Sequence, residues 1–234
     1  MTETMSAAVA PFYAIHRKMR IDTRRYVMAV ETATEADRAG RLIPLAKWAA
    51  GFGRELHLHH TVEDDYFFPA LVERSPQAGD VLAGLEHDHE VVAGILKQWG
   101  PAARDLADPT VDFATARAEV LALAVPLRDL LADHLDIEDA EIVPRFDQVL
   151  TEAELEAIDA RVKRSLPKKG LSFALPWNVE ALDPATRDEL VRTAPFVLRL
   201  LYRIHAPRFA RLVSDAFAGI PEPRLDGSPE FCSR

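Results

Sequence analysis

Two stretches of the chain repeat one pattern: HHTVEDDYFFPAL over residues 59–71 and HLDIEDAEIVPRF over residues 134–146. In both, a histidine precedes a glutamate by four residues, an aspartate follows the glutamate directly, and a proline stands six residues after the glutamate. Residues four apart are neighbours on one face of an α-helix, so each stretch can direct an imidazole and a carboxylate at one point. Two such pairs facing each other would suit iron, manganese or zinc.

Because the pattern occurs twice, it favours a metal site over a simpler interpretation. One such pair alone would also fit an acidic, solvated helix end with an incidental histidine. A second copy with the same carboxylates and the same proline favours a metal site.

The composition limits the remaining classes of function. The chain has 234 residues, 48% of them hydrophobic, which suffices for one sizeable domain with an appendage. A formal net charge of −9 argues against non-specific nucleic-acid binding. The only cysteine, Cys232, excludes a disulfide framework or a thiolate site within the chain. We find no apolar run of membrane-spanning length and no leader segment, so we expect a soluble, cytoplasmic protein without a membrane partner.

Apolar residues recur at helical spacing in four segments. Breaks fall near Ala39–Gly40, Ser75–Pro76 and Asp108–Pro109. The sequence therefore predicts an all-α fold, an antiparallel up-down four-helix bundle over residues 1–150. The four inward faces are Phe12, His16, Met19, Thr23, Tyr26 and Val30; Leu45, Trp48, Phe52, Leu56, His59 and Glu63; Leu82, Leu85, His89, Val92, Leu96 and Trp99; and Val120, Leu127, Leu131, His134 and Glu138.

A helical C-terminal extension is predicted over residues 151–220, followed by a disordered tail over 221–234. Thr151 and Glu154 form a capping box that opens a helix ending near Ser165. We expect an irregular link from Pro167 through Pro176.

We expect one more helix after this link, with Asp183 as its N-cap and Pro184 in its first turn. Phe196, Leu200 and Ile204 would share one face of it.

Each of the four bundle faces carries one histidine at a matching level. A lone buried histidine is commonly a satisfied core residue, whereas four converging imidazoles without a metal would be costly to bury. Two glutamates beside them complete a set of six candidate metal ligands: His16, His59, Glu63, His89, His134 and Glu138.

The choice between neighbouring residues stays open at several positions. His60 and Asp64 lie ~100° around the helix from His59 and Glu63, and His87 is turned ~200° from His89. Asp139 is the alternative to Glu138 on the fourth helix.

Two further histidines fall outside the inward faces. His57 is off the apolar face, and His205 belongs to the extension. For both, a solvated surface position is expected.

With these motifs, residues 10–150 resemble the haemerythrin superfamily, and in particular the bacterial haemerythrin-like HHE cation-binding domains. The resemblance implies an up-down bundle that holds two iron ions in a non-haem centre bridged by carboxylates and an oxo or hydroxo group. Manganese or zinc would suit the same donors. The six candidate ligands match the positions of the family's ligands.

Two positions depart from the family's pattern. Haemerythrins proper carry two histidines four apart on the third helix, whereas His87 and His89 are two apart and cannot share a face. Some relatives have a bridging glutamate where this chain has His60.

The sequence leads to three hypotheses of function. The first is a di-iron protein that binds or senses dioxygen or a related small oxidant such as nitric oxide or peroxide. The second is a di-iron enzyme that breaks down hydrogen peroxide. The third is an iron-responsive interaction module whose C-terminal extension contacts an unidentified protein partner.

Overall fold

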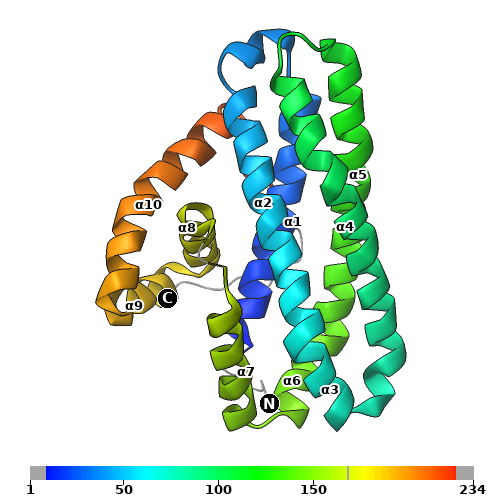
Figure 1. Cartoon of the computed structure of the whole chain (residues 1–234), viewed down its shortest axis with the longest axis vertical. Helices are drawn as coiled ribbons and strands as arrows, with labels where there is room; N and C mark the ends of the chain where they lie inside the picture. The colour runs from blue at the N-terminus through cyan, green and yellow to red at the C-terminus, as the bar shows by residue number, and fades with distance from the viewer. Residues whose placement is uncertain (1–8, 168, 225–234) are drawn as a thin grey trace.

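A long antiparallel helical bundle dominates the protein (Figure 1). The computed structural model describes residues 9–167 and 169–224, and all regular structure within them is helical. Helix α4 packs against α2 and α5, and α5 packs against α1. These helices confirm the predicted bundle; they are α1 (Ala10–Glu31), α2 (Leu42–Val62), α4 (Gly79–Ala107) and α5 (Phe113–Ile137).

The connections between the bundle helices are short. A 3-10 turn, η1 (Glu35–Ala39), joins α1 to α2, and another, η3 (Pro76–Ala78), precedes α4. The predicted break at Ser75–Pro76 is present, and α4 ends just before Asp108 as expected.

Both repeated stretches contain a π-helical turn that begins at the glutamate. These turns are η2 (Glu63–Phe67) and η4 (Glu138–Ile142), and each leads into a short helix, α3 (Phe68–Arg74) or α6 (Val143–Val149). The shared proline explains them. It has no N–H to donate and its ring crowds the carbonyl four residues earlier, so the preceding turn widens.

The bundle core is divided into two apolar clusters. One contains Met19, Leu56 and Val92, and the other contains Phe67 and Leu85. On each bundle helix the candidate ligands fall between residues of the two clusters. They therefore form a polar layer with apolar side chains above and below.

The described residues of the C-terminal extension form four helices, whose bounds differ in part from the expectation. The capped helix is confirmed, but the link predicted as irregular contains a helix that runs through Pro176. Two helices are present where a single helix was expected after Asp183. Pro195 separates them, because it lacks an N–H and disfavours helical geometry at Ala194. These helices are α7 (Glu152–Ser165), α8 (Leu171–Ala181), α9 (Pro184–Thr193) and α10 (Phe196–Ala216).

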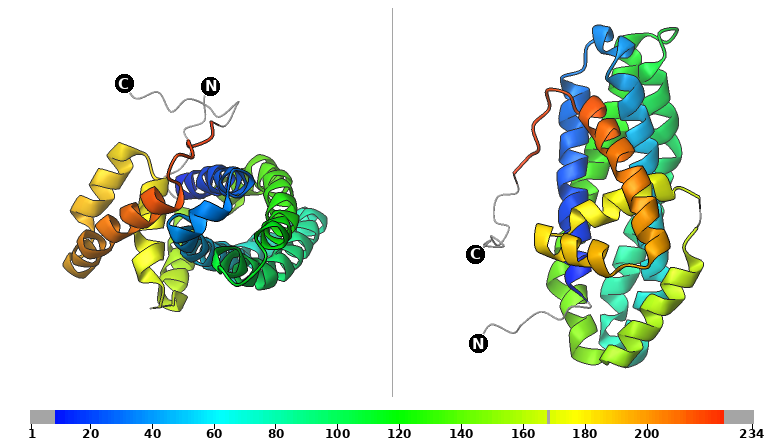
Figure 2. Two further views of the ribbon diagram at one scale, coloured as in Figure 1. Left: turned by 90° about the horizontal axis from the view of Figure 1, so that it is seen from above. Right: turned by 90° about the vertical axis from the view of Figure 1, so that its left-hand side faces the viewer.

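The extension is attached to the bundle mainly through α8 and the second half of α10. Both pack against α2, and α8 also contacts α1. There the indole N–H of Trp177 donates to the buried carboxylate of Asp22 over 2.8 Å. By contrast, α9 and the start of α10 stand out from the bundle (Figure 2).

Two expectations remain untested. The division at residue 150 stays an interpretation, and most of the tail predicted to be disordered, residues 225–234, lies outside the described residues. None of the helices in the described ranges is long and apolar enough to cross a membrane.

Candidate metal centre

Five histidines and two glutamates meet in the polar layer of the bundle. All six side chains predicted from the sequence are brought together there, and His60 joins them. Six of the seven are buried and His59 is half-buried; the set is His16, His59, His60, Glu63, His89, His134 and Glu138.

The seven side chains form two groups suited to a metal ion. His60, His89 and His134 make one group, and His16, His59, Glu63 and Glu138 make the other; within each, one donor atom per residue lies within 4.8 Å of the rest. In the first group the Nε2 atoms of His89 and His134 are 3.2 Å apart. In the second the Nε2 atoms of His16 and His59 are also 3.2 Å apart.

The two glutamates lie between the histidine groups. One oxygen of Glu63 is 3.1 Å from Nε2 of His59, and its other oxygen is 3.8 Å from Nε2 of His89. Glu138 repeats this arrangement, with one oxygen 3.6 Å from Nε2 of His16 and the other 3.5 Å from Nε2 of His134. Each carboxylate therefore directs its two oxygens at different histidine groups.

Carboxylates outside this layer orient three of the imidazoles. Asp139 lies 2.7 Å from Nδ1 of His16, and Asp64 lies 2.7 Å from Nδ1 of His89. Asp88 is 3.3 Å from Nδ1 of His134. A carboxylate on Nδ1 places the proton there and leaves Nε2 free to face the centre.

These contacts show what Asp64 and Asp139 do in the structure. Both were alternatives to the glutamates, and both instead accept from a histidine on a neighbouring helix. The other oxygen of Asp139 is held by Arg20 at 2.8 Å, which fixes the carboxylate in place.

The site has an approximate two-fold symmetry that follows the sequence repeat. His59, Glu63 and Asp64 correspond to His134, Glu138 and Asp139. The symmetry fails at one position of the repeat, because the counterpart of His60 is Leu135. One histidine group therefore has three imidazoles and the other has two.

The placement of His60 differs from the expectation. It was placed about 100° away from the face of His59, yet its ring is buried and stacks on His89 with centroids 4.0 Å apart. The helix presents two adjacent positions to the core here because neighbouring helices lie on both sides. His87 and His57 are exposed, as expected, whereas His205 is half-buried.

Several buried polar atoms at the centre have no hydrogen-bond partner among the described residues. They are Nε2 of His60, one oxygen of Glu63 and both oxygens of Glu138. Leaving such atoms unpaired in an apolar core is costly, and a cation would satisfy all of them. The donor chemistry therefore fits a bound metal.

The pKa values of the site residues show which of them takes up positive charge. Burial lowers the pKa of His16, but its contacts with Asp139 and Glu63 outweigh burial and raise that pKa to about 10. Burial and repulsion from His16 lower the pKa of His59 to about 3. Burial and the charge of Glu138 raise the pKa of Glu63. The proton on His16 thus supplies positive charge that a metal ion would replace, and metal binding would release it.

Aromatic side chains cover the site on one side. Phe68 stacks on His89 with centroids 5.7 Å apart, and Phe12 meets His16 edge-on at 6.1 Å. Phe67 packs against Phe12. Tyr26, Trp48 and Phe52 instead belong to the larger apolar cluster.

A helical bundle around a buried layer of imidazoles and carboxylates defines a cation-binding protein. Residues 8–146 match the family model described as the Hemerythrin HHE cation binding domain, and the chain belongs to this family. No curated protein and no solved structure matches the chain.

Proposed function

We propose that the chain is a non-haem di-iron protein that binds or senses dioxygen or a related small oxidant such as nitric oxide or peroxide. The observation that carries the proposal is the position of Glu63 and Glu138, whose two oxygens face different histidine groups. Carboxylates in this position suit two neighbouring cations better than one. Imidazole and carboxylate donors without thiolate suit iron, and they also suit manganese or zinc.

In this proposal His60, His89 and His134 would hold one iron, and His16 and His59 would hold the other. Glu63 and Glu138 would supply carboxylate donors to the same centre. Asp64, Asp88 and Asp139 act through the histidines as positioning residues.

The two histidine groups differ in their number of imidazoles, and this difference supports a role in binding a small external ligand. The group with His16 and His59 offers one imidazole fewer, so a metal ion held there would have fewer imidazole donors and could accept an external ligand. Phe12 lies beside His16, and His16 is fully buried. Two ferrous ions would supply the electrons with which such a site holds or reduces an oxidant.

Anaerobic loading with ferrous iron, followed by absorption spectra before and after exposure to dioxygen, tests the proposal. We expect a new charge-transfer band that fades when dioxygen is removed. Steady consumption of added peroxide would instead favour the enzyme. If dioxygen, nitric oxide and peroxide all leave the spectrum unchanged, the proposal is wrong.

His60→Leu is an informative variant, because it gives the first stretch the residue that the second has at the matching position, Leu135. We expect it to weaken metal binding at the end with His89 and His134. His57→Leu is the control, since His57 is exposed on the same helix.

A further inference from the structure

Helices α9 and α10 meet at Ala194–Pro195, and this helix–turn–helix segment, called the α9–α10 hairpin here, carries an exposed apolar tip. No residue of α9 is buried. At the start of α10, Phe196 and Val197 are 68% and 63% exposed, and Leu198 and Leu200 are also exposed. Isolated exposed apolar residues are ordinary, but adjacent ones on a projecting tip mark a contact surface.

The exposed apolar side chains point in several directions around the helix. Phe196, Val197 and Leu198 are consecutive, so they are separated by ~100° each. Phe196, Leu200 and Ile204, four apart, continue an outward apolar stripe. The opposite face of α10 seats Phe209 and Ala216 on the bundle, so the stripe is not needed for attachment.

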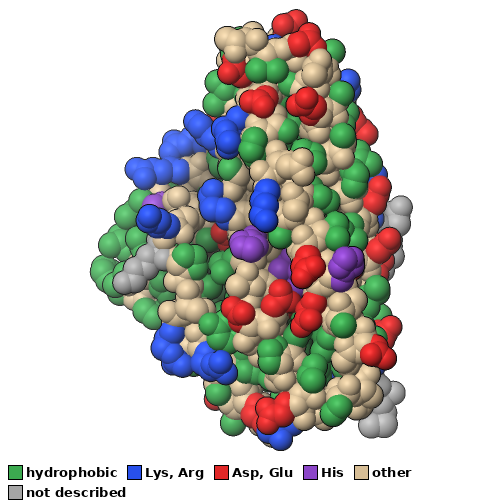
Figure 3. All heavy atoms as spheres, turned by 45° about the vertical axis from the view of Figure 1, so that its right-hand side comes forward, with side chains coloured by type: hydrophobic (Ala, Val, Ile, Leu, Met, Phe, Trp, Pro, Cys, Tyr) green, Lys and Arg blue, Asp and Glu red, His purple; other side chains and the backbone are tan. Residues whose placement is uncertain are grey.

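Positive charge lies along α10, from this tip toward the bundle. Residues 196–211 contain four arginines and no aspartate or glutamate, although the whole chain has a net charge of −9. None of the four forms an ion pair with another described residue; they are Arg199, Arg203, Arg208 and Arg211. Acidic side chains are prominent on the bundle face that Figure 3 shows.

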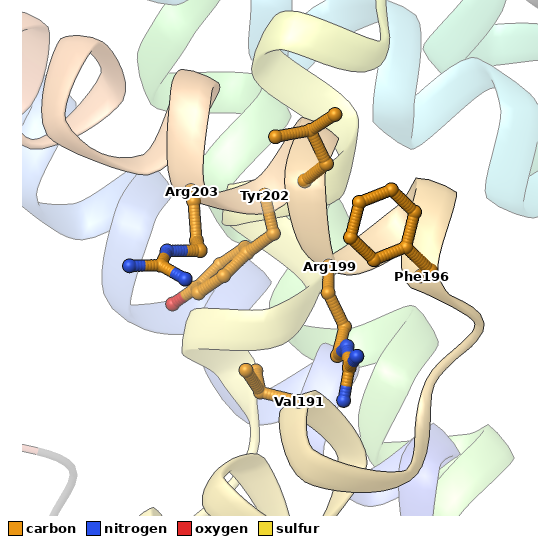
Figure 4. A pocket seen from close by; sticks show the side chains of 6 residues that line it. Val191, Phe196, Arg199, Tyr202 and Arg203 are labelled. Atoms are coloured by element: carbon orange, nitrogen blue, oxygen red, sulfur yellow. The ribbon is translucent and has the colours of Figure 1, made fainter.

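A hollow of about 500 Å³ lies beside the tip (Figure 4). Its lining combines the apolar side chains of Val191, Phe196 and Leu200 with the guanidinium groups of Arg199 and Arg203. The Phe196 ring and the two guanidinium groups border it from different sides. An acyl chain and an anionic headgroup would each find suitable partners there.

We propose that the α9–α10 hairpin docks the protein on an anionic phospholipid surface, with the apolar tip among the acyl chains and the arginines at the headgroups. A protein groove covers one face of a helix, whereas a bilayer can surround a tip that is apolar on several sides. A second copy packed on the same stripe would bring like-charged arginines together. The acidic bundle would be repelled by the surface, so the hairpin alone makes contact.

This contact is peripheral and needs no spanning helix. It departs from the expectation of no membrane partner, which rested on the lack of a spanning segment.

Co-sedimentation of the full-length, metal-loaded protein with vesicles tests the proposal. Vesicles of phosphatidylcholine containing phosphatidylglycerol are compared with phosphatidylcholine alone, at low and high salt. We expect binding to the anionic vesicles only, and weaker binding at high salt. Arg199→Gln with Arg203→Gln should lower the affinity about 30-fold, which corresponds to the loss of about 2 kcal/mol for two arginines near the surface.

Matched variants separate the hairpin from general surface effects. Phe196→Ser with Leu200→Ser should abolish binding, whereas Ile43→Ser, at an exposed position of α2, should not change it. Lys97→Gln with Arg104→Gln, both exposed on α4, removes the same charge as the arginine pair and should have little effect. Circular dichroism confirms that each variant is folded. Equal binding to neutral vesicles, unchanged binding of the hairpin variants, or self-association through the tip without vesicle binding would overturn the proposal.

Discussion

Replacing Asp139 with asparagine tests whether carboxylates outside the centre set its metal affinity. Asp139 contacts Nδ1 of His16 at 2.7 Å, and Arg20 holds its other oxygen. Asparagine keeps the shape but removes the charge, so His16 becomes a less basic and less well oriented donor. Loss of such a partner lowers metal affinity about 10- to 100-fold, which is about 1.4 to 2.7 kcal/mol.

The matched control is Asp136→Asn. Asp136 contacts the same Arg20 at 2.8 Å but is largely exposed and has no contact with a histidine. Anaerobic competition with a chromophoric chelator for ferrous iron measures both variants. The reasoning is refuted if Asp139→Asn binds iron as tightly as the unmodified protein, or if Asp136→Asn loses as much affinity.

Three further predictions concern stability and are checked by thermal or urea unfolding. Gly51→Ala should lower the free energy of unfolding by about 1–3 kcal/mol, because its new Cβ would lie 2.3 Å from the Phe173 ring of α8. The control is Gly53→Ala, whose Cβ meets only ordinary contacts, so this variant should be neutral or stabilising. Glu55→Gln should raise the free energy of unfolding at pH 8 and change it little at pH 5. Burial raises the pKa of Glu55 to about 7. The protonated Glu55 side chain therefore stabilises the fold fully below its ordinary pKa, and this contribution is lost as the pH rises through 7. Removing the metal with a chelator should lower the melting temperature, because unpaired polar groups are then left in the core.

The bundle and most of its candidate site follow from the sequence, because apolar periodicity places His16, His59, His89 and His134 on inward faces at one level. His60 remained only an alternative to His59 in the sequence analysis, because a helix with one inward face allows one inward position per turn. Its signal was the adjacent pair of histidines in a helix with neighbours on both sides. The π-helical turns could have been predicted from the sequence, since Pro69 forces a wider turn before it.

The extension was harder to predict, because α7, α8 and α9 are shorter than the bundle helices and prolines fall within or between its helices. Pro176 suggested a break, but α8 continues through it, held by Trp177 against Asp22. Pro195, in contrast, does separate two helices. Tertiary contacts, which local sequence does not reveal, decide between these outcomes.

The central claim is that the repeated histidine–glutamate stretches hold two metal ions in one centre. Elemental analysis after anaerobic loading with ferrous iron, with loosely bound metal removed, tests it most directly. The account predicts two iron ions per chain, one for each histidine group, and loss of both in a variant with Glu63→Ala and Glu138→Ala. One iron or none per chain, or two irons retained in the double variant, would contradict it.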